Sequence, residues 1–302
     1  MALIKNRSFT PIDSQGKEIP EDGLELFDLI VNDGDVHNHL GGFIPPHWHP
    51  EVEFFILEEG VIDLGIGTQI YRFLPGDGCF INSGILHSFK TKTDAPCRYR
   101  SYIFAASIVS GTPGSIFDTK YIRPLLEQGP TFFRFHPSQH EPFYTYFDQA
   151  YAACAHTTDG YEFDIREAFT KMLLYVREQS NLTSSREISS LQEMRIKHML
   201  SWIEEHLTDE ITLSDLAASA NICMRECQRL FSNYLHYTPT EYIRHKRLFH
   251  AAEQIAATDL PITEIALTYG FATPSYFSKQ FKELIGFTPS EYRRSIQKFS
   301  SI

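Results

Sequence analysis

The chain has 302 residues, a formal net charge of -11, and 42% hydrophobic residues, which predicts two domains with ample cores. No apolar run reaches the roughly 18 residues that a membrane span needs, and the N-terminus lacks the apolar segment of a secretory signal. Five scattered cysteines argue against a disulfide framework and predict a reducing cytoplasm.

The acidic excess lies in the N-terminal part of the chain. Residues 195–302 contain 12 Lys and Arg against 12 Asp and Glu, so the whole net charge of -11 belongs to residues 1–194. A polyanionic partner is therefore expected to contact the C-terminal part.

Residues from about Leu24 to Phe104 have the pattern of short strands. The stretches EFFILEEGVIDLGIG, QIYRFLPGDGCFINSG and CRYRSYIFAA combine apolar and aromatic residues with Gly, Pro and Asp at the turns. Many short strands at this spacing predict a sandwich or a barrel.

The stretch HWHPEVEFFILEEG contains a candidate ligand set. His47, His49 and Glu53 are all odd-numbered, so they share one face if the strand is continuous. His87 follows a turn and a strand that we expect to fold back beside them. Three imidazoles and one carboxylate suit zinc, iron, manganese or nickel.

These residues resemble the two-part signature of the cupin barrel. Its first motif is matched by Gly41, His47, His49, Glu53 and Gly60, and its second by Gly76, Gly84 and His87. The sequence departs from it at Asn82, where the family has proline, and at Thr91, where it has asparagine. The resemblance implies a jelly-roll-like β-barrel in which His47, His49, Glu53 and His87 hold one divalent transition metal or grip a small-molecule effector.

The pattern becomes helical from about Ser138. The stretch YEFDIREAFTKMLLYVREQ places Ile165, Phe169, Met172, Leu173 and Val176 on one stripe, which serves either as a dimer contact or to pack on its own barrel. The polar stretch NLTSSREISS then reads as a linker. We therefore expect a barrel at 1–136, a helical extension and linker at 137–190, and a second domain at 191–302.

The C-terminal domain contains an internal repeat. TPTEY at Thr238 returns as TPSEY at Thr288, 50 residues later, and LSDLAASAN pairs with ITEIALTYG. Each copy reads as a short helix, a tight turn at Asn221 or Gly270, and a second helix. This pattern is typical of a helix-turn-helix, whose second helix enters a major groove.

The outward positions of the second helices carry polar residues that suit DNA. The predicted DNA-binding residues are Arg225, Gln228, Arg229 and Ser232 in the first copy and Ser275, Tyr276, Lys279 and Lys282 in the second. The stretch Thr238 to Ala257 predicts a connecting helix of about 20 residues, roughly 30 Å long. It carries Arg244, His245, Lys246 and Arg247 as candidate phosphate contacts.

Residues from about Arg195 to Arg294 resemble the tandem helix-turn-helix domain of the AraC/XylS family of transcription regulators. The ending GFTPSEYR is the most specific match, whereas Cys223 and His236 replace the serine and glycine usual in the first copy. The combined resemblance implies an α+β two-domain chain, with a cupin sensor followed by an all-α tandem helix-turn-helix domain.

The resemblance implies a transcription regulator that binds double-stranded DNA and responds to a small-molecule effector, most often carbohydrate-related. It also implies an activator that works as a cytoplasmic homodimer, with RNA polymerase as a further partner and no enzymatic activity. Two alternatives stay open: a metal-dependent cupin enzyme, such as an isomerase or dioxygenase with a helical appendage, and a direct metal sensor.

Overall fold

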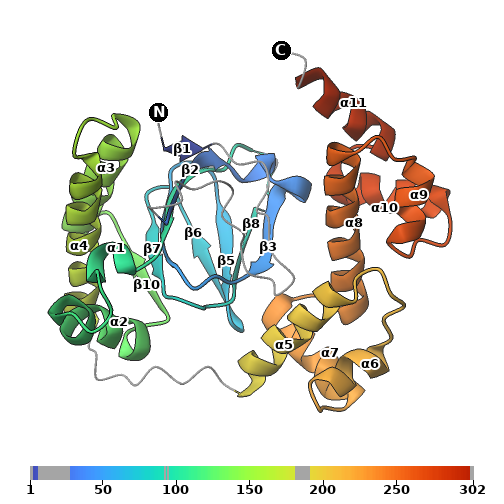
Figure 1. Cartoon of the computed structure of the whole chain (residues 1–302), viewed down its shortest axis with the longest axis horizontal. Coiled ribbons are helices and arrows are strands. Elements are labelled where there is room, and N and C mark those ends of the chain that lie inside the picture. The colour runs from blue at the N-terminus through green and yellow to red at the C-terminus, as the bar shows by residue number, and fades with distance from the viewer. Residues whose placement is uncertain (1–2, 6–27, 92, 94, 181–190, 300–302) are drawn as a thin grey trace. The chain divides into compact units, whose positions relative to one another are not determined.

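A computed structural model describes residues 3–5, 28–91, 93, 95–180 and 191–299. The chain divides into two compact units, and the main body of the second begins at Leu191 (Figure 1). The first unit is built on β-strands and the second is helical, which confirms the predicted α+β fold class.

The first unit contains two β-sheets. The larger sheet has the order β1 (Ile4–Lys5), β2 (Leu29–Asp35), β9 (Arg98–Phe104), β4 (Val52–Leu57), β7 (Gly78–Ile81) and β10 (Phe132–Phe135). The smaller sheet has the order β3 (Phe43–His47), β8 (His87–Thr91), β5 (Ile62–Ile66) and β6 (Gln69–Phe73). Apart from the parallel pair β1–β2, the neighbouring strands run antiparallel.

An apolar core with residues from both sheets fills the barrel. Phe55 of β4 stacks on Tyr99 of β9, with ring centroids 5.4 Å apart, and on Phe89 of β8, at 4.7 Å. Because Phe55 and Phe89 belong to different sheets, this aromatic stack joins the two layers.

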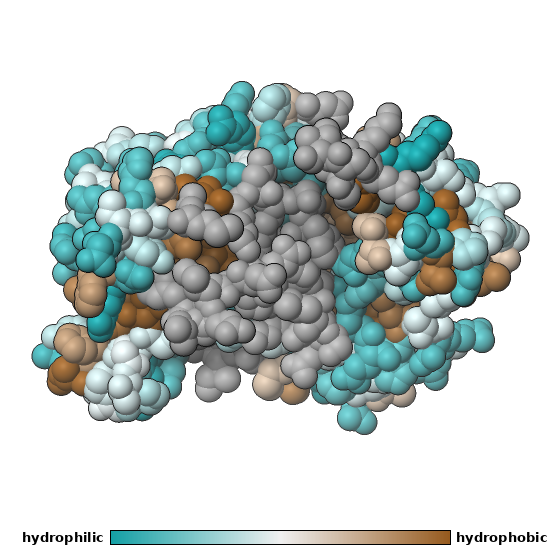
Figure 2. Space-filling model, turned by 45° about the horizontal axis from the view of Figure 1, so that its top comes forward, coloured by the Kyte–Doolittle hydropathy of each residue, from teal (hydrophilic) through white to brown (hydrophobic). Residues whose placement is uncertain are grey.

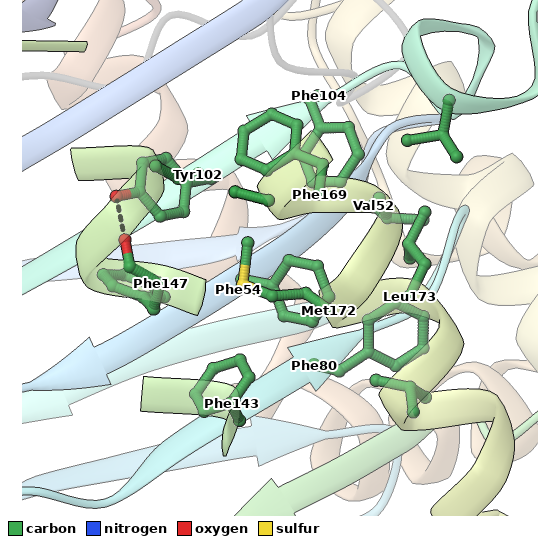
Figure 3. Close-up of a cluster of buried hydrophobic side chains, with 14 of the residues drawn as sticks. Val52, Phe54, Phe80, Tyr102, Phe104, Phe143, Phe147, Phe169, Met172 and Leu173 are labelled. Carbon is green, nitrogen blue, oxygen red and sulfur yellow. Dashed lines mark hydrogen bonds between the residues drawn. The ribbon is translucent and has the colours of Figure 1, made fainter. Parts of the chain in front are cut away.

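Two long helices cover one face of the larger sheet. α3 (Glu141–Ala155) and α4 (Tyr161–Gln179) lie side by side, and their apolar side chains form one cluster with the sheet (Figures 1 and 3). Phe169 of α4 stacks on Phe104 with ring centroids 4.0 Å apart. The hydroxyl of Tyr102 donates a hydrogen bond of 2.9 Å to the carbonyl of Phe147 in α3.

The apolar stripe of α4 is used inside the unit. All five of its predicted members, Ile165, Phe169, Met172, Leu173 and Val176, are buried in the cluster with the sheet. Of the two uses that the sequence allowed, packing on the chain's own barrel is the one observed. A dimer contact, if made by α4, has to use its other face.

Short helical segments lie between the longer elements. They are η1 (Val36–Asn38), η2 (Leu40–Gly42), α1 (Ser107–Ser110), the π-helical turn η3 (Asp118–Ile122) and α2 (Arg123–Gln128). Asn82, which replaces the cupin proline, is fully buried and donates from Nδ2 to the carbonyls of Leu125, at 3.1 Å, and Pro130, at 3.0 Å. It therefore ties the end of α2 to the turn that precedes β8.

The second unit repeats one helical motif around a long helix. Its helices are α5 (Leu191–Glu205), α6 (Leu213–Ser219), α7 (Met224–Leu235), α8 (Pro239–Ala257), α9 (Ile262–Thr268), α10 (Pro274–Ile285) and α11 (Pro289–Phe299). The pairs α6–α7 and α9–α10 are the two predicted copies. α8 has 19 residues, hence a length of about 28 Å at 1.5 Å per residue.

Local sequence signals set the ends of these helices. Thr212 and Thr238 each form a capping box with an acidic residue three positions later. The turns have left-handed backbones, with φ of 54° at Asn221 and 74° at Gly270. His236 has φ of 57°, in the place that Gly286 occupies in the second copy with φ of 89°.

Figure 2 shows one face of the molecule coloured by hydropathy. On the face shown in Figure 2, hydrophobic residues lie in separate patches among hydrophilic ones. Among the helices that the structure describes, none is both long and apolar enough to cross a membrane.

Candidate functional site

The four predicted ligands come from both sheets of the barrel. His47 ends β3 and His87 begins β8, and the two are paired in the smaller sheet. Glu53 lies in β4 of the larger sheet, and His49 lies in the segment between β3 and β4. The strand is thus not continuous from His47 to Glu53, because β3 ends at His47 and β4 begins at Val52.

The four side chains nevertheless converge. All are at most 3% exposed, and imidazole nitrogens of the three histidines lie within 4.8 Å of one another. Glu53 Oε2 is 3.2 Å from His87 Nε2 and 3.5 Å from His49 Nε2. The predicted set is therefore one buried cluster.

Backbone carbonyls fix the orientation of each ring. The Nδ1 atoms of His47, His49 and His87 lie 2.9, 3.0 and 2.8 Å from the carbonyl oxygens of Pro45, Glu51 and Ile85. A carbonyl only accepts hydrogen bonds, so each Nδ1 carries the proton. In a neutral ring the lone pair then lies on Nε2, which faces the cluster.

Burial and the neighbouring rings shift the pKa values of two members of the cluster. Burial, and then the neighbouring His87 and His49, lower the pKa of His47 well below its usual value, so this ring is neutral near pH 7. Burial opposes ionisation of Glu53, but its polar contacts with His49 and His87 outweigh that effect and hold its pKa at about 2. The carboxylate is therefore ionised.

The donor set fits a divalent transition metal. Imidazole nitrogens and an ionised carboxylate are donor types that zinc, iron, manganese and nickel accept. Among the described residues, neither Glu53 Oε2 nor His87 Nε2 has a well-aligned hydrogen-bond partner. Buried polar atoms of this kind need a partner, and a metal bound by imidazole and carboxylate supplies one.

The first helix-turn-helix presents its predicted residues on α7. Arg225, Gln228, Arg229 and Ser232 are all exposed, whereas Cys227 and Phe231 face the core. Arg229 is not free, because its Nε and Nη2 donate to the carboxylate of Glu226 at 2.8 and 2.6 Å. The spacing Glu-x-x-Arg on one helix is the sequence signal for this pair.

The second helix-turn-helix presents an equivalent face on α10. Ser275, Tyr276, Lys279 and Lys282 are all exposed, and Phe277 and Phe281 are buried. Lys279 Nζ lies 3.9 Å from Glu283 Oε1, a loose surface contact. The two outward faces therefore differ in chemistry, since the first carries arginines and the second carries lysines and a tyrosine.

The connecting helix requires one correction. Lys246, predicted to contact phosphate, is only 4% exposed, and its Nζ lies 3.1 Å from Glu204 Oε1 of α5. It stabilises the interior of the unit and is not available to DNA. Arg247 is also engaged, through hydrogen bonds from Nε to Leu207 O at 2.9 Å and from Nη2 to Asp209 O at 2.5 Å.

Comparisons with known proteins agree with both halves of the chain. Residues 34–173 match the family model of the AraC-like ligand binding domain, and residues 216–295 match a helix-turn-helix domain model. The uncharacterised HTH-type transcriptional regulator YdeC of Bacillus subtilis is 25% identical over 94% of this chain and 97% of its own length.

Two relatives that are named as activators extend this agreement. The HTH-type transcriptional activator AarP of Providencia stuartii is 35% identical over 38% of this chain and 84% of its own length. The HTH-type transcriptional activator RhaS of an Enterobacter strain is 24% identical over 83% of this chain and 87% of its own length. These relatives are regulators rather than enzymes, and the chain belongs to the AraC family of transcriptional regulators.

Proposed function

We propose that this regulator recognises its effector inside the barrel, at His47, His49, Glu53 and His87. The observation that supports the proposal is the convergence of three buried imidazoles, each oriented at Nδ1 by a backbone carbonyl, with one buried, ionised carboxylate. A divalent metal held by these residues (zinc, iron, manganese or nickel) would supply positive charge for oxygen atoms of the effector. The effector class that we propose is a sugar or a sugar derivative, which offers hydroxyl or carboxylate oxygens.

The test combines metal content with DNA binding. Wild-type protein and His87→Ala are purified side by side, with His156→Ala as the control, because His156 is an exposed histidine outside the cluster. We expect about one metal ion per wild-type and His156→Ala chain and almost none in His87→Ala, by mass spectrometry of the metal. Equal metal in all three proteins would contradict the assigned ligands.

The effector itself is identified by its influence on DNA affinity. A panel of neutral sugars and sugar acids is titrated while fluorescence anisotropy follows a fragment selected from random DNA. An active compound should change the affinity of wild type and of His156→Ala, and leave that of His87→Ala unchanged. Coupling requires that the compound favour one arrangement of the protein over another.

A direct metal sensor is the second candidate, because the donor set alone could bind its signal. In that case the metal changes DNA affinity with no organic compound present. Titration of metal-free protein with each metal ion separates the two candidates, since the first predicts that metal alone has no effect on DNA binding.

We propose further that α7 and α10 read successive major grooves on one side of the duplex. The support is the exposure of Arg225 and Gln228 on α7 and of Lys279 and Lys282 on α10. The connecting helix α8 has a length close to the roughly 34 Å between such grooves. Protection of two regions about one helical turn apart in a footprint would support this arrangement, and a single short region would contradict it.

We also propose that the protein works in the cytoplasm as a homodimer that recruits RNA polymerase. The apolar stripe of α4 is buried within its own unit, so the dimer contact cannot use that stripe. Sedimentation of the full chain at micromolar concentration tests the dimer, and transcription in vitro with purified polymerase tests activation.

A further inference from the structure

An open cleft of about 210 Å³ lies in the DNA-binding unit. One face of α8 lines it with Thr240, Ile243, Arg244 and Arg247, and the segment that leads into α6 adds Ile211 and Leu213. The turn between α9 and α10, at Tyr269 to Phe271, and the first turn of α10, at Tyr276, close the other side.

The lining of the cleft is positively charged. Its lining includes the guanidinium groups of Arg244 and Arg247 and no carboxylate. The acid nearest in sequence on α8, Glu241, is already engaged, because Thr238 donates to its Oε2 from both N and Oγ1. In the described part of the chain, Arg244 makes neither a hydrogen bond nor an ion pair.

Two hydrogen bonds fix the orientation of the Arg247 guanidinium. Hydrogen bonds to two backbone carbonyls anchor its Nε and Nη2 and leave Nη1 beside Gly270, where an added Cβ would lie 2.9 Å from that atom. A guanidinium whose plane is fixed in this way pairs with a carboxylate without losing rotamer freedom. Gly270 also has φ of 74°, a backbone conformation that favours glycine in the turn. The absence of a side chain there also leaves space for Arg247 in the cleft.

The remaining walls are apolar and aromatic. Phe271 and Ile243 are buried behind the cleft, and Tyr276, at 47% exposed, forms part of its rim. An inorganic anion would contact the arginines but would leave the apolar walls in contact with water. A flat apolar body that carries a carboxylate satisfies both parts of the lining.

We infer that this cleft binds a small organic carboxylate with an aromatic or similarly flat apolar body, as a second ligand site in the DNA-binding unit. Its residues belong to both helix-turn-helix copies and to α8. The consequence for regulation rests on the proposed DNA-reading face, because Arg244 and Tyr276 are also predicted DNA contacts. A bound carboxylate is expected to compete with DNA at these two residues.

The binding test uses the full chain without DNA, so it does not depend on the proposed function. 2-Naphthoate is titrated by calorimetry, with 2-naphthamide as its neutral isostere and inorganic phosphate as the bare anion. We expect saturable binding of 2-naphthoate, and at least about tenfold weaker binding of the other two compounds, because a charge-assisted pair contributes about this much.

Variants locate the site. Arg244→Gln should weaken 2-naphthoate binding about tenfold or more, and Thr240→Trp, which fills the exposed edge of the cleft, should do the same. Arg294→Gln, which removes an exposed arginine of α11 outside the cleft, and His87→Ala in the barrel should bind as wild type does.

The inference is overturned if wild type shows no saturable binding of 2-naphthoate, or if phosphate binds as tightly. It is also overturned if both cleft variants bind normally, or if His87→Ala abolishes binding, because the acid then occupies the barrel. A separate anisotropy titration asks whether 2-naphthoate displaces DNA. Normal naphthoate binding without displacement would leave the cleft intact and reject only its link to the DNA-reading face.

Discussion

Arg225 and Arg229 lie one helical turn apart on α7, but only Arg225 is free to contact a base. Arg229 is paired with Glu226 through two hydrogen bonds, whereas Arg225 is exposed and forms no ion pair within the described residues. An unpaired arginine can donate to both acceptors of a guanine edge without first breaking a bond.

Arg225→Ala is therefore expected to weaken binding to the specific site by about 1–3 kcal/mol and to relax sequence preference there. Arg229→Ala should cost less, because Arg229 has to leave Glu226 before it reaches DNA. Anisotropy with the selected site and with single-base variants measures both effects. Arg72→Ala, an exposed arginine of the barrel, is the control, and an equal loss in all three variants would refute the assignment.

Lys246 has a structural role that makes a different prediction. Its ammonium and the carboxylate of Glu204 are each 4% exposed, and His250 also lies 2.7 Å from that carboxylate. Removal of one member leaves a buried charge, so Lys246→Met should lower the free energy of unfolding by about 3–5 kcal/mol. The double variant Lys246→Met with Glu204→Leu should lose less, as measured by urea denaturation.

The same cluster predicts a dependence of stability on pH. Burial opposes the charge of Glu204, but His250 and Lys246 outweigh it and lower the pKa of Glu204 below 4.5. A carboxyl with a depressed pKa in the folded state stabilises fully above its unfolded value and loses this contribution as pH falls through the folded value. The stability difference between wild type and Glu204→Gln should therefore be largest above pH 4.5 and shrink below it.

Single residues also show what the sequence alone could reveal. The spacing of His47, His49, Glu53 and His87 predicted one cluster, because the cupin motif fixes which residues meet. Lys246 could not be assigned in this way, since its partner Glu204 lies 42 positions away in another helix. Helical spacing does place Lys246 on the buried face with Tyr242, but a lone lysine reads more easily as exposed.

The turn that ends α7 has a strained backbone. His236 adopts φ of 57°, which a residue with a Cβ reaches at a cost of roughly 1–2 kcal/mol, and Gly286 has the matching place after α10. We predict that His236→Gly raises the free energy of unfolding by about 0.5–1 kcal/mol, after the greater entropy of glycine in the unfolded chain is counted. Gly286→Ala should lower it by a similar amount, and thermal denaturation of the two variants checks both signs.

Elements were predicted best where local signals agree. The helix of α8 was expected at Thr238 to Ala257 and observed at Pro239–Ala257, because the capping threonine and the following proline both mark its start. The apolar stripe of α4 was recognised, but its partner was not, since amphipathicity shows that a face is covered without showing what covers it. The break between β3 and β4 was missed because the alternation of ligands looked unbroken across Pro50.

The two units each have the elements of an independent domain, and their ligands differ. Metal should bind the barrel at His47, His49, Glu53 and His87, and DNA should bind the helical unit. We predict two unfolding transitions in calorimetry, one raised by metal and the other by DNA. His87→Ala should abolish the metal effect and keep the DNA effect, and a single transition raised equally by both ligands would show that the units unfold together.

Asn82 is a position at which substitution by the residue usual in the family is expected to destabilise the protein. The consensus residue for its position in the cupin motif is proline, so a design that restores common residues would select Asn82→Pro. That change would remove the hydrogen bonds from the Asn82 side chain to the carbonyls of Leu125 and Pro130. In this chain a side-chain amide, rather than a proline ring, fixes the turn and holds the short helix α2 beside it.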